Sequence, residues 1–90
     1  MRKAMINLAK HNVSFEEAAT VFADQNAFDD RSRTHSHQEL RRLRLGMSAA
    51  GRVLIIVYTV RRYGDGETIR IISARPSNRE EELGYTGIQD

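Results

Sequence analysis

The chain has 90 residues, no cysteine and a formal net charge of +2. This length suits one small domain. The lack of cysteine excludes disulfides and thiolate metal sites. No apolar run approaches the roughly 20 residues that span a bilayer, and the first residues lack a signal-peptide pattern. The sequence therefore predicts a cytoplasmic protein that does not act in a membrane.

Positive charge is concentrated in the middle of the chain. Residues 40–79 contain nine arginines against two acidic residues, which is +7, and the rest contains five basic against ten acidic residues, which is −5. Twelve of the fourteen basic residues are arginines, whose planar guanidinium groups suit phosphate oxygens. The pattern predicts a polyanionic partner. A solvated sheet face with many salt bridges is the alternative.

Two short helices are expected first. Residues 2–11 carry apolar side chains at helical spacing, and Asn12 is a suitable stop. Ser14 and Glu17 have the spacing of a capping box ahead of a second helix. That helix is expected to lay one apolar stripe on a sheet. The stripe consists of Phe15, Ala18, Ala19 and Phe22.

The strands are expected after a polar stretch. Residues 27–28 predict a brief edge strand before a turn at residues 29–30, and residues 39–45 predict a strand with exposed arginines that ends at Gly46. A helix is the alternative for residues 39–45. Residues 53–60 are apolar on both faces, which predicts a central strand. A glycine-bearing turn then joins it to a second strand over residues 69–75, in which side chains alternate between the faces.

The chain is expected to end in a helix. Pro76 cannot continue a central strand. Ser77 and Glu80 have capping-box spacing, so a short helix is predicted over residues 78–85. The order of elements predicts one α+β domain over residues 1–90, with a small antiparallel sheet, two N-terminal helices and a short C-terminal helix on one face.

The sequence also carries a family signature. The run NLAKHNVSFEEA, which starts at Asn7, resembles the opening of the BrnT family of type II toxins. The family's order and spacing continue through Gly51-Arg52, the segment VYT at 57–59 and the segment RIISAR at 70–75. The closing pattern is met by Arg79, Glu81 and Tyr85. The chain departs from the family pattern at Asn12, Leu40 and Ser77.

The resemblance implies a RelE-like fold and an endoribonuclease toxin, a hydrolase that cleaves RNA without metal or cofactor. It also implies a cognate DNA-binding antitoxin of the BrnA type, which would neutralise the toxin and alone contact operator DNA. The resemblance leaves open whether the chain forms a dimer or a hetero-tetramer with the antitoxin. Family members begin with a strand and a Trp-Asp pair before the first helix. This sequence shows neither, so we expect a sheet edge that is exposed or is left for another chain to pair with. The alternative is a non-catalytic or degenerate module that binds antitoxin or nucleic acid through its arginine-rich face.

Cleavage of RNA without a metal needs a base for the ribose 2′-hydroxyl, an acid for the leaving oxygen and cations for the phosphorane charge. The catalytic candidates are Lys10, His11, Arg41, Tyr58 and Arg75. Histidine titrates near neutral pH, arginines bind phosphate, and a tyrosine supplies a hydroxyl or a stacking ring. The RNA-binding candidates are Arg52, Arg61, Arg70 and Arg79.

Each catalytic candidate has a structural alternative. His11 can interact with the last carbonyls of its helix, and the lysine beside it can be a solvated surface residue. Arg75 can form an ion pair, for instance with Glu81 or Glu17. Tyr58 can serve packing in a central strand.

A weaker pattern lies in the polar stretch. His35 and His37 fall on the same side of an extended segment, which is half of a metal site. A complete site needs further ligands, so an exposed loop is the favoured interpretation and no metal is expected.

Overall fold

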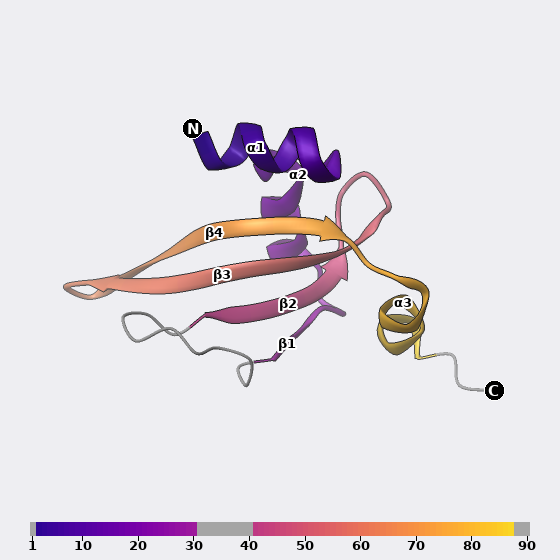
Figure 1. The fold of residues 1–90 in the computed structure, drawn as a ribbon. Coiled ribbons are helices and arrows are strands. Elements are labelled where there is room, and N and C mark those ends of the chain that lie inside the picture. The colour runs from indigo at the N-terminus through magenta and orange to yellow at the C-terminus, as the bar shows by residue number, and fades with distance from the viewer. Residues whose placement is uncertain (1, 31–40, 88–90) are drawn as a thin grey trace.

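The structure, a computed structural model, describes residues 2–30 and 41–87. Within these residues three helices, a 3-10 turn and four strands form an α+β domain (Figure 1). Their order confirms the predicted succession of two helices, strands and a helix. None of the described helices has both the length and the hydropathy of a membrane span. The elements are α1 (Arg2–His11), α2 (Phe15–Thr20), η1 (Val21–Ala23), β1 (Phe28–Asp30), β2 (Arg42–Met47), β3 (Val53–Tyr63), β4 (Gly66–Pro76) and α3 (Arg79–Thr86).

The strands form one antiparallel sheet in the order β1-β2-β3-β4. β3 and β4 are joined by a two-residue turn, in which Gly64 has a φ of 59°, a conformation that glycine adopts without strain. Among the described residues, β2 accompanies β3 only as far as Tyr58. The β3–β4 ribbon continues beyond it to the turn.

Side chains of β3 are buried on both faces of the sheet, which confirms the predicted central strand. Successive residues of a strand point to opposite faces. One face therefore presents Leu54 and Ile56 to α2 and η1, and the other presents Val53 and Ile55. The first cluster comprises Val13, Ala18, Val21, Leu54, Ile56, Tyr58 and Ala74. The second comprises Leu45, Val53 and Ile55, with Leu43 and Tyr85 packed against it.

A bulge interrupts the alternation of β4. Val57 pairs with Ser73, but Tyr58 pairs with Ile71, so Ile72 is an extra residue. Ile71 and Ala74 consequently both pack against the first cluster. The predicted alternation along this strand is therefore wrong at the bulge, because one added residue changes the face for all that follow.

α1 is fixed to the sheet by a polar side chain, that of Asn7, which is 5% exposed. Its amide nitrogen donates to the carbonyl of Ala74 at 2.8 Å and to that of Val13 at 2.9 Å, and its oxygen accepts from the Ala74 N–H at 3.0 Å. The amide thus pairs with the edge of β4 as a neighbouring strand would. The apolar Ile6 and Leu8 are exposed. Asn12 has a φ of 57° and ends the helix as predicted.

The second helix, α2, ends at Thr20, before Phe22, the last residue of the predicted apolar stripe. Ser14 caps it by accepting from the Glu17 N–H at 2.9 Å, as predicted, but the Glu17 carboxylate bonds to Ser48 and Arg52 and does not complete a capping box. The chain continues as the tighter η1, which changes the residues that face the sheet. Val21 is buried there and Ala19 is exposed.

The two strands at the β1 edge differ from prediction. Asp29 and Asp30 lie in β1 and not in a turn, because both pair with β2. Gly46 lies inside β2 and does not end it. A Cβ there would meet the Ala27 Cβ at 2.6 Å and a Val21 methyl at 2.9 Å, so only glycine fits the close approach of η1.

The arginines of β2 are less exposed than expected. The Arg44 side chain is 15% exposed and pairs with Asp29 at 2.9 Å. Its other nitrogens donate to the carbonyls of Val21 and Asp24. This residue ties η1 and β1 to the sheet.

The N-cap of α3 is Asn78, one residue later than the predicted cap, Ser77. Asn78 and Glu81 form the capping box, whereas the Ser77 N–H still donates to the Val53 carbonyl at 2.9 Å. The structure also shows on which face of the sheet α3 lies. Tyr85 packs against the second cluster, on the face opposite the one that α2 covers. The three helices therefore lie on both faces of the sheet.

We expect Asn7→Ala to lower the free energy of unfolding by about 2–4 kcal/mol, because it leaves buried backbone groups of Ala74 and Val13 without partners. Urea denaturation measures this change. Leu8→Ala, on the exposed side of the same helix, is the matched control and should cost less than about 1 kcal/mol. Equal losses in the two variants would contradict the role of the amide.

Candidate functional site

The sheet face that carries α3, here called the α3 face, is built from two rows of cross-strand neighbours. The first row runs Phe28, Leu45, Ile55, Arg75, and the second runs Asp30, Leu43, Val57, Ser73. Neighbouring positions in a row are about 4.8 Å apart. Each row thus crosses from β1 over an apolar centre to β4. This face is where chemical groups from distant parts of the sequence meet.

Lys10 and His11 reach this sheet at the edge of β4. They line a hollow of about 220 Å³ together with Ile72 and Ser73. Lys10 and His11 follow Asn7 by three and four residues, so all three lie on one side of α1. The bonds of Asn7 to β4 therefore set the position of this pair.

Arg75 stands two residues beyond Ser73 on the same face of β4. Its guanidinium forms a two-pronged ion pair with Glu81 of α3, with both N–O distances 2.9 Å. These bonds hold the pKa of the Glu81 carboxyl below its ordinary value. The Arg75 side chain is still 43% exposed. The ion-pair alternative is thus observed, and the pair leaves part of the Arg75 side chain at the surface.

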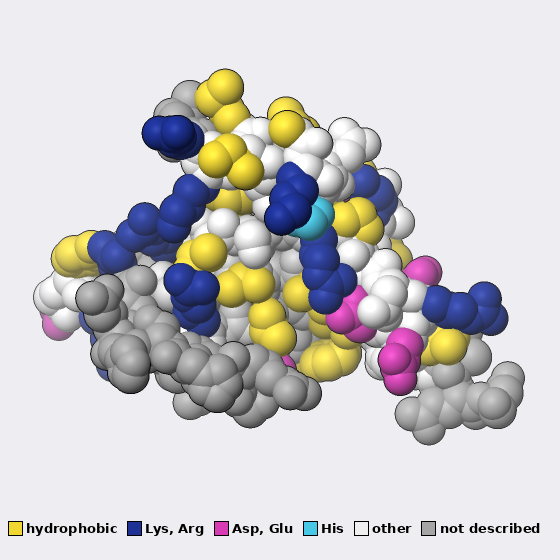
Figure 2. All heavy atoms as spheres, in the orientation of Figure 1, with side chains coloured by type: hydrophobic (Ala, Val, Ile, Leu, Met, Phe, Trp, Pro, Cys, Tyr) yellow, Lys and Arg dark blue, Asp and Glu magenta, His cyan; other side chains and the backbone are white. Residues whose placement is uncertain are grey.

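Figure 2 shows how charge is arranged around this area. Lys and Arg side chains flank a group of apolar side chains, and acidic side chains gather toward α3. The histidine side chain in this view, drawn in cyan, lies beside Lys and Arg side chains. The structure thus gathers Lys10, His11 and Arg75 at one edge of one face.

Tyr58 is not part of this group. It lies on the opposite face, is 4% exposed, and donates from its hydroxyl to Asp29 at 2.8 Å. Its ring meets Phe22 edge-on at a centroid distance of 4.9 Å. Burial, and then the Asp29 carboxylate, raise the pKa of the Tyr58 hydroxyl. The structure therefore supports the packing alternative for this residue.

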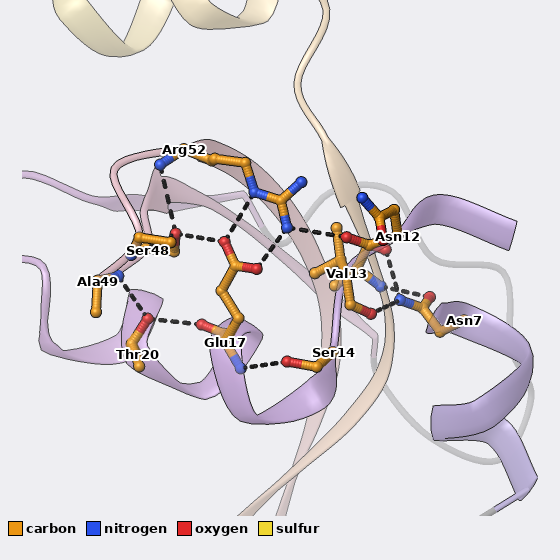
Figure 3. Close-up of polar contacts among 11 residues, drawn as sticks. Asn7, Asn12, Val13, Ser14, Glu17, Thr20, Ser48, Ala49 and Arg52 are labelled. Atoms are coloured by element: carbon orange, nitrogen blue, oxygen red, sulfur yellow. Dashed lines mark hydrogen bonds and ion pairs between the residues drawn. The ribbon is translucent and has the colours of Figure 1, made fainter. Parts of the chain in front are cut away.

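Arg52 holds the loop between β2 and β3 against α2 (Figure 3). It pairs with both carboxylate oxygens of Glu17 and donates to the Asn12 carbonyl at 2.9 Å. Ser48 donates to the same carboxylate at 2.6 Å. No local pattern in the sequence joins Glu17 to Arg52, 35 residues apart. The contact depends on the tertiary structure.

The other predicted arginines are spread over the α3 side of the molecule. Arg41 is exposed, two residues before Leu43. Arg70 is exposed and pairs across from Thr59, and Arg61 pairs across from Thr68. Arg79 is exposed as the first residue of α3. Sequence reasoning missed two parts of this face, namely Ser73 and the apolar residues of β1 and β2.

A metal site has little support. Among residues 2–30 and 41–87, no group of three or more His, Cys, Asp or Glu side chains is placed to hold a metal ion. His35 and His37 lie outside the described residues.

The chain matches the model of a known protein family. The model of the family described as "Ribonuclease toxin, BrnT, of type II toxin-antitoxin system" matches residues 1–81 of the chain. Among curated proteins nothing matches.

We expect Glu17→Gln to lower the free energy of unfolding at pH 7 by about 2 kcal/mol, because Arg52 and Ser48 lose a charged partner. Hydrogen bonds from Arg52, and then from Ser48, lower the Glu17 pKa below its usual 4.5. The carboxylate therefore stabilises the fold above pH 4.5, and this contribution is lost as pH falls through the lowered pKa.

The difference between parent and variant should consequently shrink below pH 4.5. Urea denaturation at a series of pH values from 7 to about 3 tests this. The exposed Glu16→Gln is the control and should change stability by a few tenths of a kcal/mol. A difference that stays constant with pH would refute the assignment.

Proposed function

Because this chain belongs to the BrnT family of ribonuclease toxins of type II toxin–antitoxin systems, we propose that it is an endoribonuclease that cleaves RNA without a metal ion. The proposed site is the edge of the α3 face at β4. We further propose that it acts in the cytoplasm, where RNA is available.

The observation that carries this proposal is the convergence of Lys10, His11 and Arg75 at one strand edge. Lys10 and His11 line the same hollow as Ser73, and the Arg75 side chain projects from the same face two residues away. These residues supply the groups that the reaction requires, namely proton donors and acceptors beside a fixed cation.

In the proposed reaction, the ribose 2′-oxygen attacks phosphorus while the bond to the 5′-oxygen breaks. Lys10 and His11 share the two proton transfers, one from the 2′-hydroxyl and one to the 5′-oxygen. Arg75 binds the nonbridging oxygens, on which negative charge grows. Its ion pair with Glu81 fixes the guanidinium before RNA arrives, and such preorganisation favours the charged transition state.

The RNA backbone is proposed to run along the remaining arginines of this side, which are Arg41, Arg61, Arg70 and Arg79. Arg52 and Tyr58, which the sequence also suggested, are left out of the proposed contacts. Arg52 is engaged by Glu17 and the Asn12 carbonyl, and the Tyr58 hydroxyl is bonded to Asp29 on the other face.

The protein partner is proposed to be a DNA-binding antitoxin of the BrnA type. A protein antitoxin is a property of type II systems, to which the family belongs. Operator DNA would then be contacted through the antitoxin.

A non-catalytic binding module is the second candidate. The observation that favours it is the Arg75–Glu81 pair, since the same bonds also anchor α3 to β4. In that case Arg75 would still affect binding, whereas Lys10 and His11 would not affect turnover.

We expect His11→Ala and Lys10→Ala each to lower the rate of RNA cleavage by about 10²–10⁴-fold, the usual contribution of a general acid or base. Arg75→Ala should lower it by about 10²–10³-fold through lost stabilisation of charge. Cleavage of a labelled single-stranded RNA by purified protein measures this, with growth arrest after induction as the parallel assay.

The control is Arg62→Ala. Its side chain is 77% exposed and pairs only with Glu67 among the salt bridges of the described residues, so cleavage should be unchanged. A parent that is folded but leaves RNA intact would refute catalysis and support the binding module.

A further inference from the structure

The α3 face contains a groove of about 460 Å³ that the proposed reaction does not use. It is lined by Phe28, Asp30, Leu43, Leu45, Ile55 and Glu81. Three strands and α3 contribute to it. Its position, shape and charge each restrict what it can bind.

The groove opens beside Arg75. Phe28, Leu45 and Ile55 belong to the same cross-strand row as Arg75, which places Arg75 one strand spacing, about 4.8 Å, from Ile55. Glu81 both lines the groove and holds the guanidinium. A phosphate on Arg75 would therefore carry its attached nucleoside over the groove.

The walls of the groove suit a flat aromatic ligand. Leu45 and Ile55 form an apolar floor, each only 8% exposed. Phe28 stands at the β1 end with 47% of its surface exposed, which leaves its ring accessible. Exposed aromatic rings are the usual stacking partners of unpaired bases in single-stranded RNA.

The charge of the groove determines the orientation of the ligand. Its two charged lining residues, Asp30 and Glu81, are both acidic. Carboxylates repel a phosphate, whereas an uncharged base can lie beside them. The RNA backbone is thus directed to the basic β4 edge, and the base to the acidic and apolar side.

From this arrangement we propose that the groove is a nucleobase subsite, which stacks one base of the RNA on Phe28 next to the phosphate bound by Arg75. This proposal rests on the proposed function, since it takes RNA as the ligand.

The test uses a short fluorescein-labelled RNA with 2′-fluoro riboses, which the protein cannot cleave, and a series of copies that each lack one base. Binding is measured by anisotropy for the parent and for Phe28→Ala. We expect Phe28→Ala to raise the Kd of the complete RNA about tenfold. For the copy that lacks the base at the subsite, the same substitution should change the Kd less than about twofold.

Tyr63→Ala is the matched control, because Tyr63 is an exposed aromatic residue at the hairpin turn, away from the groove. It should change neither Kd. Phe28→Leu keeps an apolar side chain without the ring and should lose most of the affinity that Phe28→Ala loses. Circular dichroism checks that each variant is folded.

Three results would overturn the subsite: no binding of the RNA by the parent, no effect of Phe28→Ala, or equal effects on the complete RNA and on every abasic copy. Loss of antitoxin binding with unchanged RNA binding would instead assign the groove to the protein partner, and would also refute the proposal. Cleavage of unmodified RNA is measured separately. Base-dependent binding without any cleavage would refute the proposed ribonuclease activity and leave the subsite intact.

Discussion

The arrangement of this molecule depends on the side-chain amide of Asn7. α1 has few apolar contacts with the sheet, since Ile6 and Leu8 are exposed. The buried amide instead satisfies both backbone groups of Ala74 at the edge of β4. An amide pairs with a strand edge because its donor and acceptor match those of a peptide group. One side chain therefore fixes the distance between α1 and β4, and with it the position of Lys10 and His11 beside Ser73.

The arginines divide into two groups, those that hold the fold together and those that are exposed to a ligand. Arg44, Arg52 and Arg75 each bind a carboxylate and at least one backbone carbonyl, and so connect distant elements. Buried or half-buried guanidinium groups need such partners, since an unpaired charge away from water is costly. A positive segment in the sequence thus overstates the charge that is available to a ligand. Arg75 belongs to both groups, because it is paired and still 43% exposed.

The α3 face is chemically asymmetric. Its β4 edge carries cations, whereas the side toward β1 and α3 is apolar with acidic side chains at its rim. In the proposed complex, RNA places its phosphates at one half and a base at the other. A purely electrostatic surface would bind a polyanion in many registers. The two halves of this face instead favour one register.

The sequence by itself determined the elements that rest on local rules. The apolar run of β3 predicted a central strand, the glycine turn predicted the hairpin, and Asn12 and Ser14 marked a helix end and a helix start. The motifs also predicted the family. The sequence by itself did not determine which residues contact one another. The bulge at Ile72 changed which side chains of β4 share a face. η1 passes so close to β2 that position 46 must be glycine, and the Glu17 carboxylate binds Arg52 and does not cap its own helix. The same holds for the site, where Lys10 and His11 join Arg75 but Tyr58 is placed on the opposite face. These outcomes depend on contacts between residues far apart in the chain, and such contacts are decided by packing and by the pairing of buried polar groups, which no local pattern encodes.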